Sequence, residues 1–357
     1  MKVLVLTVVH DPEDARVRHR QIPVLQRAGH EVTLAAPFTE HGRSVPGDLL
    51  AIDVPRARGR NRLRAVLAAR RLLRRRAQDF DLVLMHDPEL LLAARGLRGT
   101  FVWDVHEDTV ASLRLKPWLP RPLRPVAARA AQAMERWAEE HLNLLLAEES
   151  YQERFSRPHP VVPNSVVPPE DPRTDVERRV VYVGRVSLKR GAREMVELGR
   201  RLQGDVEVHV IGSADPGCVE LMRAAHAEGA VVWHGFVPNE EALAQVEGAL
   251  AGLSLLHDEP NYAHSVPTKM LEYLAHGVPV LTTPNPISVR LVEEGDCGIV
   301  VPFGDVAAAE AAVRSLDADR EERARLVRNG RAMVLERFDW RKDGERFVAA
   351  LEGFARA

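Results

Sequence analysis

The feature that most constrains the fold is a repeated order of short, continuous apolar runs separated by amphipathic stretches. Apolar runs without internal alternation indicate parallel strands covered on both faces, and stretches such as 191–203, 239–249 and 305–316 have a helical period. The expected strands are residues 3–9, 31–36, 82–86, 101–106 and 142–147, then 180–184, 206–212, 231–235, 253–257, 278–283 and 298–303. The same order in both halves predicts an α/β protein with two doubly wound, Rossmann-like domains.

The domain boundary is predicted at a proline-rich segment in the middle of the chain. The chain has 357 residues, which is long for a single hydrophobic core. Residues 157–175 contain six prolines and no helical period, as expected of a semi-rigid linker. We therefore expect one domain over 1–165 and a second over 166–338, followed by an amphipathic C-terminal helix over 339–357.

The charge distribution, the cysteine content and the lengths of the apolar runs indicate which kinds of site and which location to expect. The net charge is −2, but residues 1–164 carry 26 Lys/Arg and 20 Asp/Glu, which leaves 23 and 31 for the remainder, so the halves have net charges of +6 and −8. The two cysteines suggest neither a disulfide framework nor a zinc site, and a reducing, cytoplasmic location is expected. No apolar run reaches the roughly 18 residues of a membrane-spanning helix, and the N-terminal apolar run is short for a secretory signal.

The segment after the first predicted strand argues against a dinucleotide cofactor. Ligands of open α/β sheets bind at the carboxyl ends of the strands, so two such domains are expected to bind substrate between those ends. Residues 10–20, HDPEDARVRHR, contain no glycine, whereas a dinucleotide site needs a glycine-rich turn here. His10, Asp14, Arg16 and Arg18 instead suit a hydroxylated or anionic ligand. The alternative is a solvated loop that caps the next helix.

Two further strand ends in the first half carry polar residues. Residues 104–108, DVHED, place Asp104, His106 and Glu107 where a ligand would be met. Asp87 precedes Pro88 after an earlier strand, and this pair is typical of a helix N-cap followed by the first helical residue. His106 is therefore the stronger functional candidate, and Asp87 is interpreted as a cap.

The first strand of the second half ends in a basic loop. In VGRVSLKRG, residues 183–191, Gly184 permits a tight exit, and Arg185, Lys189 and Arg190 follow it. Guanidinium groups pair bidentately with phosphate oxygens, so the loop indicates a diphosphate site. A charged surface loop is the alternative.

The segment HSVPTKMLEYLAHGVPVLTT, residues 264–283, combines a proline-initiated helix with a polar side. Pro267 suits the first helical position, and the N–H groups of Thr268 and Lys269 then face an anion at the helix N-terminus. Glu272 lies five residues further, about 7.5 Å along the axis, which roughly matches the distance from a diphosphate to a ribose. The spacing sets Ser265, Thr268, Lys269 and Glu272 opposite a buried face. The segment predicts a nucleoside-diphosphate site; a purely structural helix is the alternative.

With these residues in view, the chain resembles bacterial glycosyltransferases of family 4, a retaining, metal-independent group with the GT-B fold. The resemblance covers nearly the whole length. GRVSLKRG, VHVIGSADP, VVWHGF and LEYLAHGVPVLTT are similar to the family's donor domain in order and spacing. MHDPELL, WDVHED and VVPNSV are similar to its acceptor domain and linker.

The resemblance implies a role for each matching position. Arg185 and Arg190 would hold the donor's diphosphate, assisted by Gly184 and Lys189, and Glu272 would hold the ribose. Gly235, Phe236 and Val237 would frame the base, and His106 would approach the transferred sugar. His10, Asp14, Arg16 and Glu107 would shape the acceptor side. The C-terminal helix would return to the first domain.

Three positions depart from the family pattern. His264 stands where the first of two glutamates eight positions apart is usual, so the choice of donor sugar is left open. The S-x-P-T-K form of the motif, with Ser265 and Lys269, favours an active enzyme. Arg190 replaces the family lysine, with Lys189 or Lys269 able to supply the ammonium group. HDPED replaces the glycine pair after the first strand.

The expected activity is retaining transfer of a sugar from a nucleotide-sugar, with a UDP-sugar favoured, to a hydroxyl of a small molecule, natural product or glycan. Cationic side chains would stabilise the departing diphosphate, so neither a metal nor a cofactor is expected. Two alternatives stay open: a GT-B nucleotide-sugar epimerase, and a catalytically silent nucleotide-sugar-binding subunit.

Arginine-rich segments raise the question of a further partner. Residues 56–78 hold ten arginines with Leu63, Val66, Leu67 and Leu73 among them, and residues 115–125 add Trp118. Both segments suit peripheral contact with an anionic membrane, at the inner face of the cytoplasmic membrane. The alternative is a solvated helix in an arginine-rich protein. Nucleic acid is not expected, because aromatic residues make up 5% of the chain and do not interleave with the charges.

Overall fold

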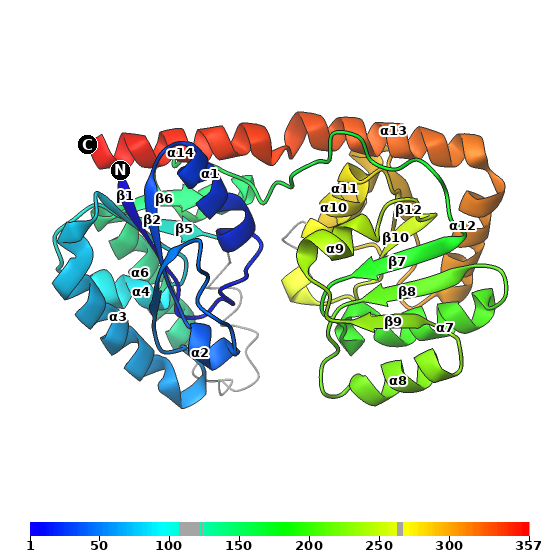
Figure 1. The fold of residues 1–357 in the computed structure, drawn as a ribbon, viewed down its shortest axis with the longest axis horizontal. Helices are drawn as coiled ribbons and strands as arrows, with labels where there is room; N and C mark the ends of the chain where they lie inside the picture. Colours follow the sequence, from blue (N-terminus) through cyan, green and yellow to red (C-terminus); the bar gives the residue numbers. More distant parts are fainter. Residues whose placement is uncertain (107–121, 123, 263–266, 357) are drawn as a thin grey trace. The chain divides into compact units, whose positions relative to one another are not determined.

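The computed structural model describes residues 1–106, 122, 124–262 and 267–356. The chain forms two compact units, one of residues 1–164 together with 341–357 and the other of residues 165–340. Each unit contains one parallel six-stranded sheet (Figure 1). In the described part of the chain, no helix is both long enough and apolar enough to cross a membrane.

The sheet of the first unit has the strand order β3-β2-β1-β4-β5-β6. Its strands are β1 (Lys2–Leu6), β2 (Glu31–Ala36), β3 (Leu50–Asp53), β4 (Leu82–Met85), β5 (Phe101–Val105) and β6 (Asn143–Leu146). Its helices are α1 (Ile22–Arg27), α2 (Phe38–His41), α3 (Arg62–Arg76), α4 (Glu89–Ala94), α6 (Arg124–His141) and the C-terminal α14 (Trp340–Arg356). This order reverses direction between β1 and β4, which is where doubly wound sheets bind ligands.

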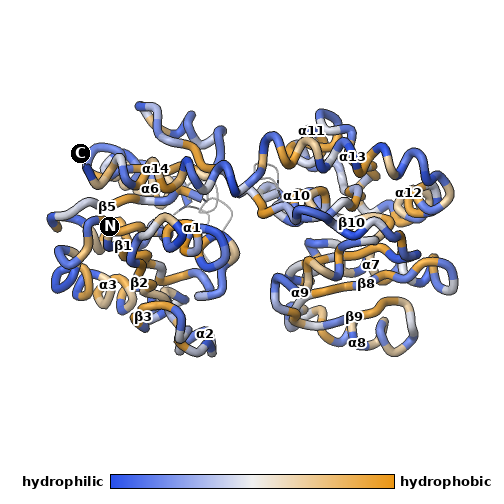
Figure 2. Tube along the Cα trace, turned by 45° about the horizontal axis from the view of Figure 1, so that its top comes forward, coloured by the Kyte–Doolittle hydropathy of each residue, from blue (hydrophilic) through white to orange (hydrophobic). Residues whose placement is uncertain are grey.

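The first unit buries its largest side chains where helices cover the sheet. One face of the sheet packs against α3, α4 and α6, through residues that include Leu73, Leu91 and Ala138. Trp103 of β5 is almost fully buried in this cluster. The continuous apolar strands are thus explained by burial under helices, and hydrophobic residues lie both along the strands and on parts of the helices (Figure 2).

The second unit repeats the arrangement, with strand order β12-β11-β10-β7-β8-β9. Its strands are β7 (Arg179–Val183), β8 (Glu207–Ile211), β9 (Val232–Gly235), β10 (Ala251–Ser254), β11 (Val280–Thr282) and β12 (Gly298–Val300). Its helices are α7 (Ala192–Leu202), α8 (Val219–Ala227), α9 (Asn239–Ala244), α10 (Thr268–Ala275), α11 (Pro286–Gly295), α12 (Val306–Ala318) and α13 (Arg320–Arg337). Here the order reverses between β7 and β10.

The predicted α/β class with two Rossmann-like domains is confirmed by the two parallel sheets. The strand β3 was not predicted, because its four residues form a sheet edge and none is fully buried. Several strands are shorter than their apolar runs; the run 3–9, for example, ends as a strand at Leu6, although Val8 in the loop that follows is fully buried. Apolarity extends past the strand ends because the loops there are also packed inside the protein.

Candidate functional site

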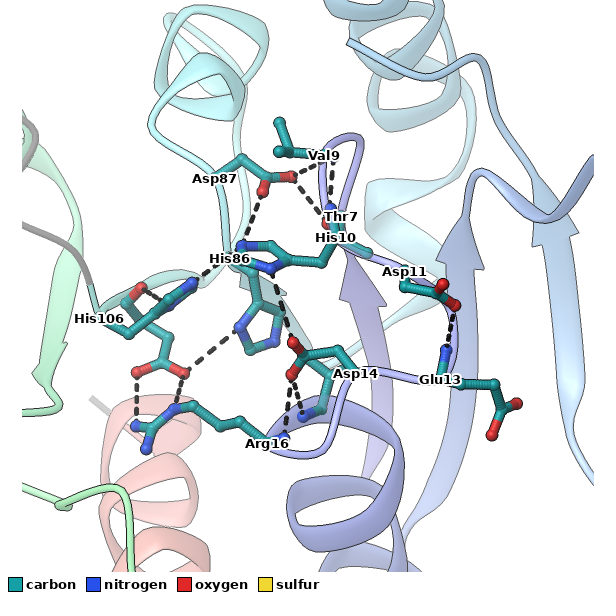
Figure 3. A network of polar contacts seen from close by, with 12 residues as sticks. Thr7, Val9, His10, Asp11, Glu13, Asp14, Arg16, His86, Asp87 and His106 are labelled. Carbon is teal, nitrogen blue, oxygen red and sulfur yellow. Dashed lines mark hydrogen bonds and ion pairs between the residues drawn. The ribbon is translucent and has the colours of Figure 1, made fainter. Parts of the chain in front are cut away.

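Polar side chains of the first unit gather at the carboxyl ends of β1, β4 and β5, at the reversal point of the sheet (Figure 3). Asp87, which follows β4, is 1% exposed. Its Oδ2 accepts hydrogen bonds from the Thr7 hydroxyl at 2.9 Å and the Val9 N–H at 3.2 Å. Asp87 thus ties the loop after β1 to the end of β4. Its interpretation as the cap of α4 was wrong, since Pro88 occupies the N-cap position and no side chain caps that helix.

A buried ion pair supports the same loop. Arg16 donates from Nε to Asp104 Oδ2 and from Nη2 to Asp104 Oδ1, both at 2.8 Å, and Asp104 is fully buried. Gln21 Nε2 donates to the same carboxylate at 2.7 Å. Burial opposes ionisation of Asp104, but Arg16 and His86 hold the pKa of its carboxyl well below the usual range. Arg16, predicted to shape the acceptor side, is therefore engaged in orienting Asp104 and the chain around it.

His106 has one proton arrangement that satisfies its neighbours. Its Nδ1 lies 3.0 Å from the carbonyl oxygen of Asp104, which can only accept, so Nδ1 carries the proton. Its Nε2 then accepts from His10 Nε2 at 2.9 Å. Burial, together with nearby cationic groups, lowers the pKa of His106 to about 3, so the imidazole is neutral near pH 7. A neutral imidazole held in this orientation can hydrogen-bond a polar substrate without placing a positive charge beside it.

His10 completes the network on the other side. Its Nε2 also lies 3.3 Å from Asp87 Oδ1, and its Nδ1 lies 3.7 Å from Asp14 Oδ2. Each nitrogen of His10 thus lies near a carboxylate, and the pKa of Asp14 is lowered because hydrogen bonding to His10 overcomes the effect of burial. The predicted residues His10, Asp14 and His106 thus come together in one network (Figure 3).

The pKa of His106 gives a testable pH dependence. Since the folded state keeps His106 neutral down to about pH 3 while the unfolded chain takes up a proton below about pH 6.5, stability falls as pH drops through that window. Between pH 7 and pH 5 this amounts to about 2 kcal/mol of unfolding free energy. Urea unfolding of wild type and His106→Asn at both pH values measures it. An equal loss in the two proteins would contradict the assignment.

Three side chains in this network have metal-ligand spacing. The donor atoms of His86, Asp104 and His106 lie within 4.8 Å of one another. The Asp104 carboxylate already accepts two N–H groups of Arg16, and the His106 Nδ1 proton is directed at a carbonyl. A dication would have to compete with the guanidinium for the same carboxylate, so we interpret the cluster as a hydrogen-bonded network. His86 is fully buried, and its Nε2 has no hydrogen-bond partner among the described residues.

The second unit places a lysine at the equivalent reversal point. Lys269, in the first turn of α10, has its Nζ 3.7 Å from the centroid of the Tyr182 ring. An added Cβ at Gly184 would lie 3.5 Å from this Nζ, so the amine packs over the exit of β7. Nζ is buried and, within the described part of the chain, has no hydrogen-bond acceptor. Burial and the neighbouring Arg190 hold the pKa of Lys269 well below its usual range.

Arg190 lies close to this amine, whereas the other two loop cations do not join it. Burial would lower the pKa of Arg190, but the neighbouring Tyr182 and Tyr262 hydroxyls raise it above its ordinary value. Arg185 is 68% exposed and pairs with Asp215, and Lys189 is 63% exposed and pairs with Glu259 at 2.8 Å. Arg190 and Lys269 therefore lie close together beyond the end of β7, whereas Arg185 pairs with a carboxylate; the diphosphate roles predicted for Arg185, Arg190 and Lys269 remain predictions.

The helix α10 also differs from its prediction in detail. Pro267 is its N-cap and not its first helical residue. Lys269 and Glu272 were expected on a polar face, but Glu272 is only 8% exposed and interacts electrostatically with Lys269. The Lys269 amine is thus directed inward to the end of β7, where a ligand of an α/β sheet binds, and the Glu272 side chain is buried.

Glycines bring the strand exits of the second unit close together. Gly191 has a φ of +84°, and an added Cβ there would lie 2.5 Å from the Leu255 carbonyl oxygen. Gly212 has a φ of +146°, and its N–H donates to the Gly235 carbonyl at 2.7 Å. Phe236 beyond it is 61% exposed, and Val237 packs against the core. Gly235, Phe236 and Val237 thus leave β9 beside the exit of β8.

Some candidates lie outside the described residues, and others were missed. Glu107, His264 and Ser265 belong to the first group. His86, Tyr182 and Tyr262 were not predicted: a histidine or tyrosine in an apolar run, such as His86 or Tyr182, is indistinguishable from a core residue, and Tyr262 lies in a loop that carries no motif. The bridging role of Asp87 required the loop geometry.

Comparison with known proteins relates the chain to glycosyltransferases. Residues 169–333 match the family model for glycosyl transferases group 1. The chain is 25% identical to a phosphatidyl-myo-inositol mannosyltransferase of Mycobacterium leprae, over 92% of this chain and 87% of that protein. It is likewise 25% identical to that of Mycolicibacterium smegmatis, over 89% and 84%. These matches support a relationship to a glycosyltransferase family; family 4 and the motif type remain predictions.

Solved structures establish the fold class. Sucrose-phosphate synthase from Thermosynechococcus elongatus has a TM-score of 0.73 at 16% identity, covering 100% of this chain and 99% of that one. Anabaena HepE in complex with UDP has a TM-score of 0.70 at 15% identity, covering 99% and 100%. WaaG, a glycosyltransferase involved in lipopolysaccharide biosynthesis, has a TM-score of 0.71 at 15% identity, covering 99% and 100%. The chain has the GT-B fold, as predicted.

Proposed function

We propose that this chain is a glycosyltransferase that moves a sugar from a nucleoside-diphosphate donor, with UDP as the favoured carrier, to a hydroxyl group of an acceptor. The family model and the curated mannosyltransferases support the transferase class. A structure of the same fold in complex with UDP supports the nucleotide. The observation that carries the proposal is the Lys269 amine, buried at the first turn of α10 without an acceptor among the described residues.

The position of the buried Lys269 amine indicates where the donor's diphosphate is proposed to bind. A buried cation without an acceptor is unfavourable on its own and favourable once an anion arrives, so Lys269 and Arg190 are proposed to bind the diphosphate. The N-terminus of α10 adds the positive end of its dipole. Glu272, one turn beyond Lys269, is proposed to accept hydrogen bonds from the ribose hydroxyls. Residues 235–237 are proposed to frame the base.

The chemistry proposed needs charge stabilisation on the leaving group. As the bond from sugar to phosphate breaks, negative charge grows on the diphosphate, and the two cations lower its energy. The acceptor oxygen bonds to the anomeric carbon on the face that the diphosphate leaves, which gives retention, and a donor phosphate oxygen takes the proton of the acceptor hydroxyl; this step includes no metal or cofactor. Neutral His106, oriented by the Asp104 carbonyl, is proposed to contact the transferred sugar in the first unit's site. Arg185 stays a secondary candidate, since Asp215 already pairs with it.

A donor panel tests the proposal. The purified chain is heated with UDP, GDP, ADP or dTDP, and the matching nucleotide at 100 times its dissociation constant is expected to add about 2.7 kcal/mol of stability. Turnover is then followed as release of that diphosphate from its sugar conjugate in the presence of acceptor hydroxyls. Binding without release would favour the silent subunit, and incorporation of deuterium at C2 would favour the epimerase. No stabilisation by any diphosphate would contradict all three.

Peripheral membrane contact remains a proposal for α3. Leu63 and Leu67 are 69% and 44% exposed among arginines, whereas Leu73 is buried in the first unit, so only part of the predicted apolar side is available. Most of 115–125, including Trp118, lies outside the described residues. A cytoplasmic protein at the inner membrane face is expected to sediment with anionic but not with zwitterionic vesicles, and to be released by salt.

A further inference from the structure

The first unit contains a pocket of about 810 Å³ beside His106. Its two walls are α4, with Leu91 and Leu92, and α6, with Met134 and Trp137. Its floor is formed by the carboxyl ends of β4 and β5. A pocket of this size is in the range that binds small molecules.

The pocket is open because α6 presents small residues to it. Ala127, Ala130, Ala131 and Ala133 line it, and Ala130 and Ala133 are exposed. No alanine side chain can reach across to α4, so among the described residues nothing fills the space between the two helices. On the opposite wall Leu92 is 53% exposed. The middle of the pocket is therefore apolar on both sides.

The two ends of the pocket have different chemistry. At the inner end lie His10, His86 and His106, and the fully buried His86 has an Nε2 without a partner among the described residues. At the outer end the Arg95 guanidinium lies 5.9 Å from the Trp137 ring centroid. Within the described part of the chain, no carboxylate forms an ion pair with Arg95, whereas neighbouring Arg62 is paired with Glu89. One end can thus hold a hydroxyl group, and the other an anion.

We propose that this pocket binds the acceptor, and that the acceptor is an amphiphile with an apolar body, a hydroxyl group at the histidine end and an acidic group at Arg95. A sugar acceptor fits poorly, because hydroxyl groups set against alanine, leucine and tryptophan would lose hydrogen bonds to water without replacement. An apolar body gains about 0.8 kcal/mol for each buried CH₂ group. The inference rests on the proposed function, since it names the acceptor class of that reaction.

Binding of model acceptors to the full chain tests the proposal. The probes are 6-hydroxy-2-naphthoate for a ring body, 12-hydroxydodecanoate for a chain body, uncharged 2-naphthol, and glucose. Quenching of tryptophan fluorescence reports binding, because Trp137 lines the pocket. At least one of the two acids is expected to bind tenfold or more tightly than glucose. The acid that binds more tightly shows whether the apolar body of the acceptor is a ring or a chain. Acids that bind no better than glucose would overturn the proposal.

Variants of α6 and α4 locate the site. Ala130→Phe fills the pocket and is expected to weaken binding of the acid at least tenfold, whereas Gln132→Phe, exposed on the same helix and outside the lining, leaves it unchanged. Arg95→Gln is expected to weaken the naphthoate about tenfold and to leave 2-naphthol unaffected. An unchanged affinity of Ala130→Phe would overturn the proposal.

Measuring UDP binding by the same proteins distinguishes a failure of the acceptor proposal from a failure of the proposed function. The nucleotide is proposed to bind the second unit, so Ala130→Phe should bind UDP as wild type does. UDP binding with no preference for the acids contradicts the acceptor class alone. If the wild-type protein does not bind UDP, the proposed function itself is contradicted.

Discussion

Replacing Arg16 with leucine is expected to lower the free energy of unfolding by about 3–5 kcal/mol, which is the usual consequence of removing one partner of a buried ion pair. Asp104 is fully buried, and both of its oxygens accept hydrogen bonds from Arg16 at 2.8 Å. Without the guanidinium, the carboxylate has to stay charged in the interior or take up a proton. Urea denaturation at pH 7 measures the loss.

Two control variants make this result specific. Arg43→Leu removes a partly exposed pair with Asp11 and is expected to lower stability by less than about 1 kcal/mol. Arg16→Leu combined with Asp104→Asn removes the uncompensated charge and should recover more than half of the loss. A double variant as unstable as Arg16→Leu alone would show that the cause is lost packing of the arginine and not the buried charge.

Replacing Lys269 with methionine is expected to have opposite effects on stability and binding. In the ligand-free protein the variant should be more stable by about 1–2 kcal/mol, because a buried amine, without an acceptor in the described part of the chain, is exchanged for an apolar chain of similar length. Nucleotide binding should weaken by at least tenfold to a hundredfold, the usual effect of losing a charge-assisted hydrogen bond. Thermal unfolding with and without UDP measures both changes in one experiment.

Lys189→Met is the matched control for this prediction. Lys189 belongs to the same basic loop, but it is exposed and paired with Glu259. Its replacement should change neither the ligand-free stability by more than about 0.5 kcal/mol nor the shift produced by UDP. If Lys269→Met destabilised the ligand-free protein and kept its UDP shift, Lys269 would be a structural residue supporting α10.

The architecture was predictable because a strand buried on both faces has a continuous apolar run in its sequence. Runs such as 180–184 and 206–212 are apolar without alternation, and both became central strands. β3 was not predicted because an edge strand with no fully buried residue has no such apolar run. The periodicity of α10 was also recognised, but its orientation was not: residue spacing identifies two faces and does not decide which is buried when a polar face meets strand ends.

The site was predictable in its residue types and less so in its contacts. His10, Asp14 and His106 were selected because they follow strands, and parallel strands end at one edge. The pair of Arg16 with Asp104 joins residues 88 positions apart, so only the folded chain shows that Arg16 supports the site instead of facing a ligand. Likewise, nothing in the basic loop distinguishes Arg185, which turns to Asp215, from Arg190, which packs beside Lys269.

The most direct measurement compares UDP with UMP by isothermal titration calorimetry on wild type and Lys269→Met. If the second unit holds a diphosphate through Lys269 and Arg190, wild type should bind UDP at least tenfold more tightly than UMP, and most of that difference should disappear in the variant. Equal affinities of wild type for UDP and UMP, or a preference for UDP that survives the loss of Lys269, would contradict the account.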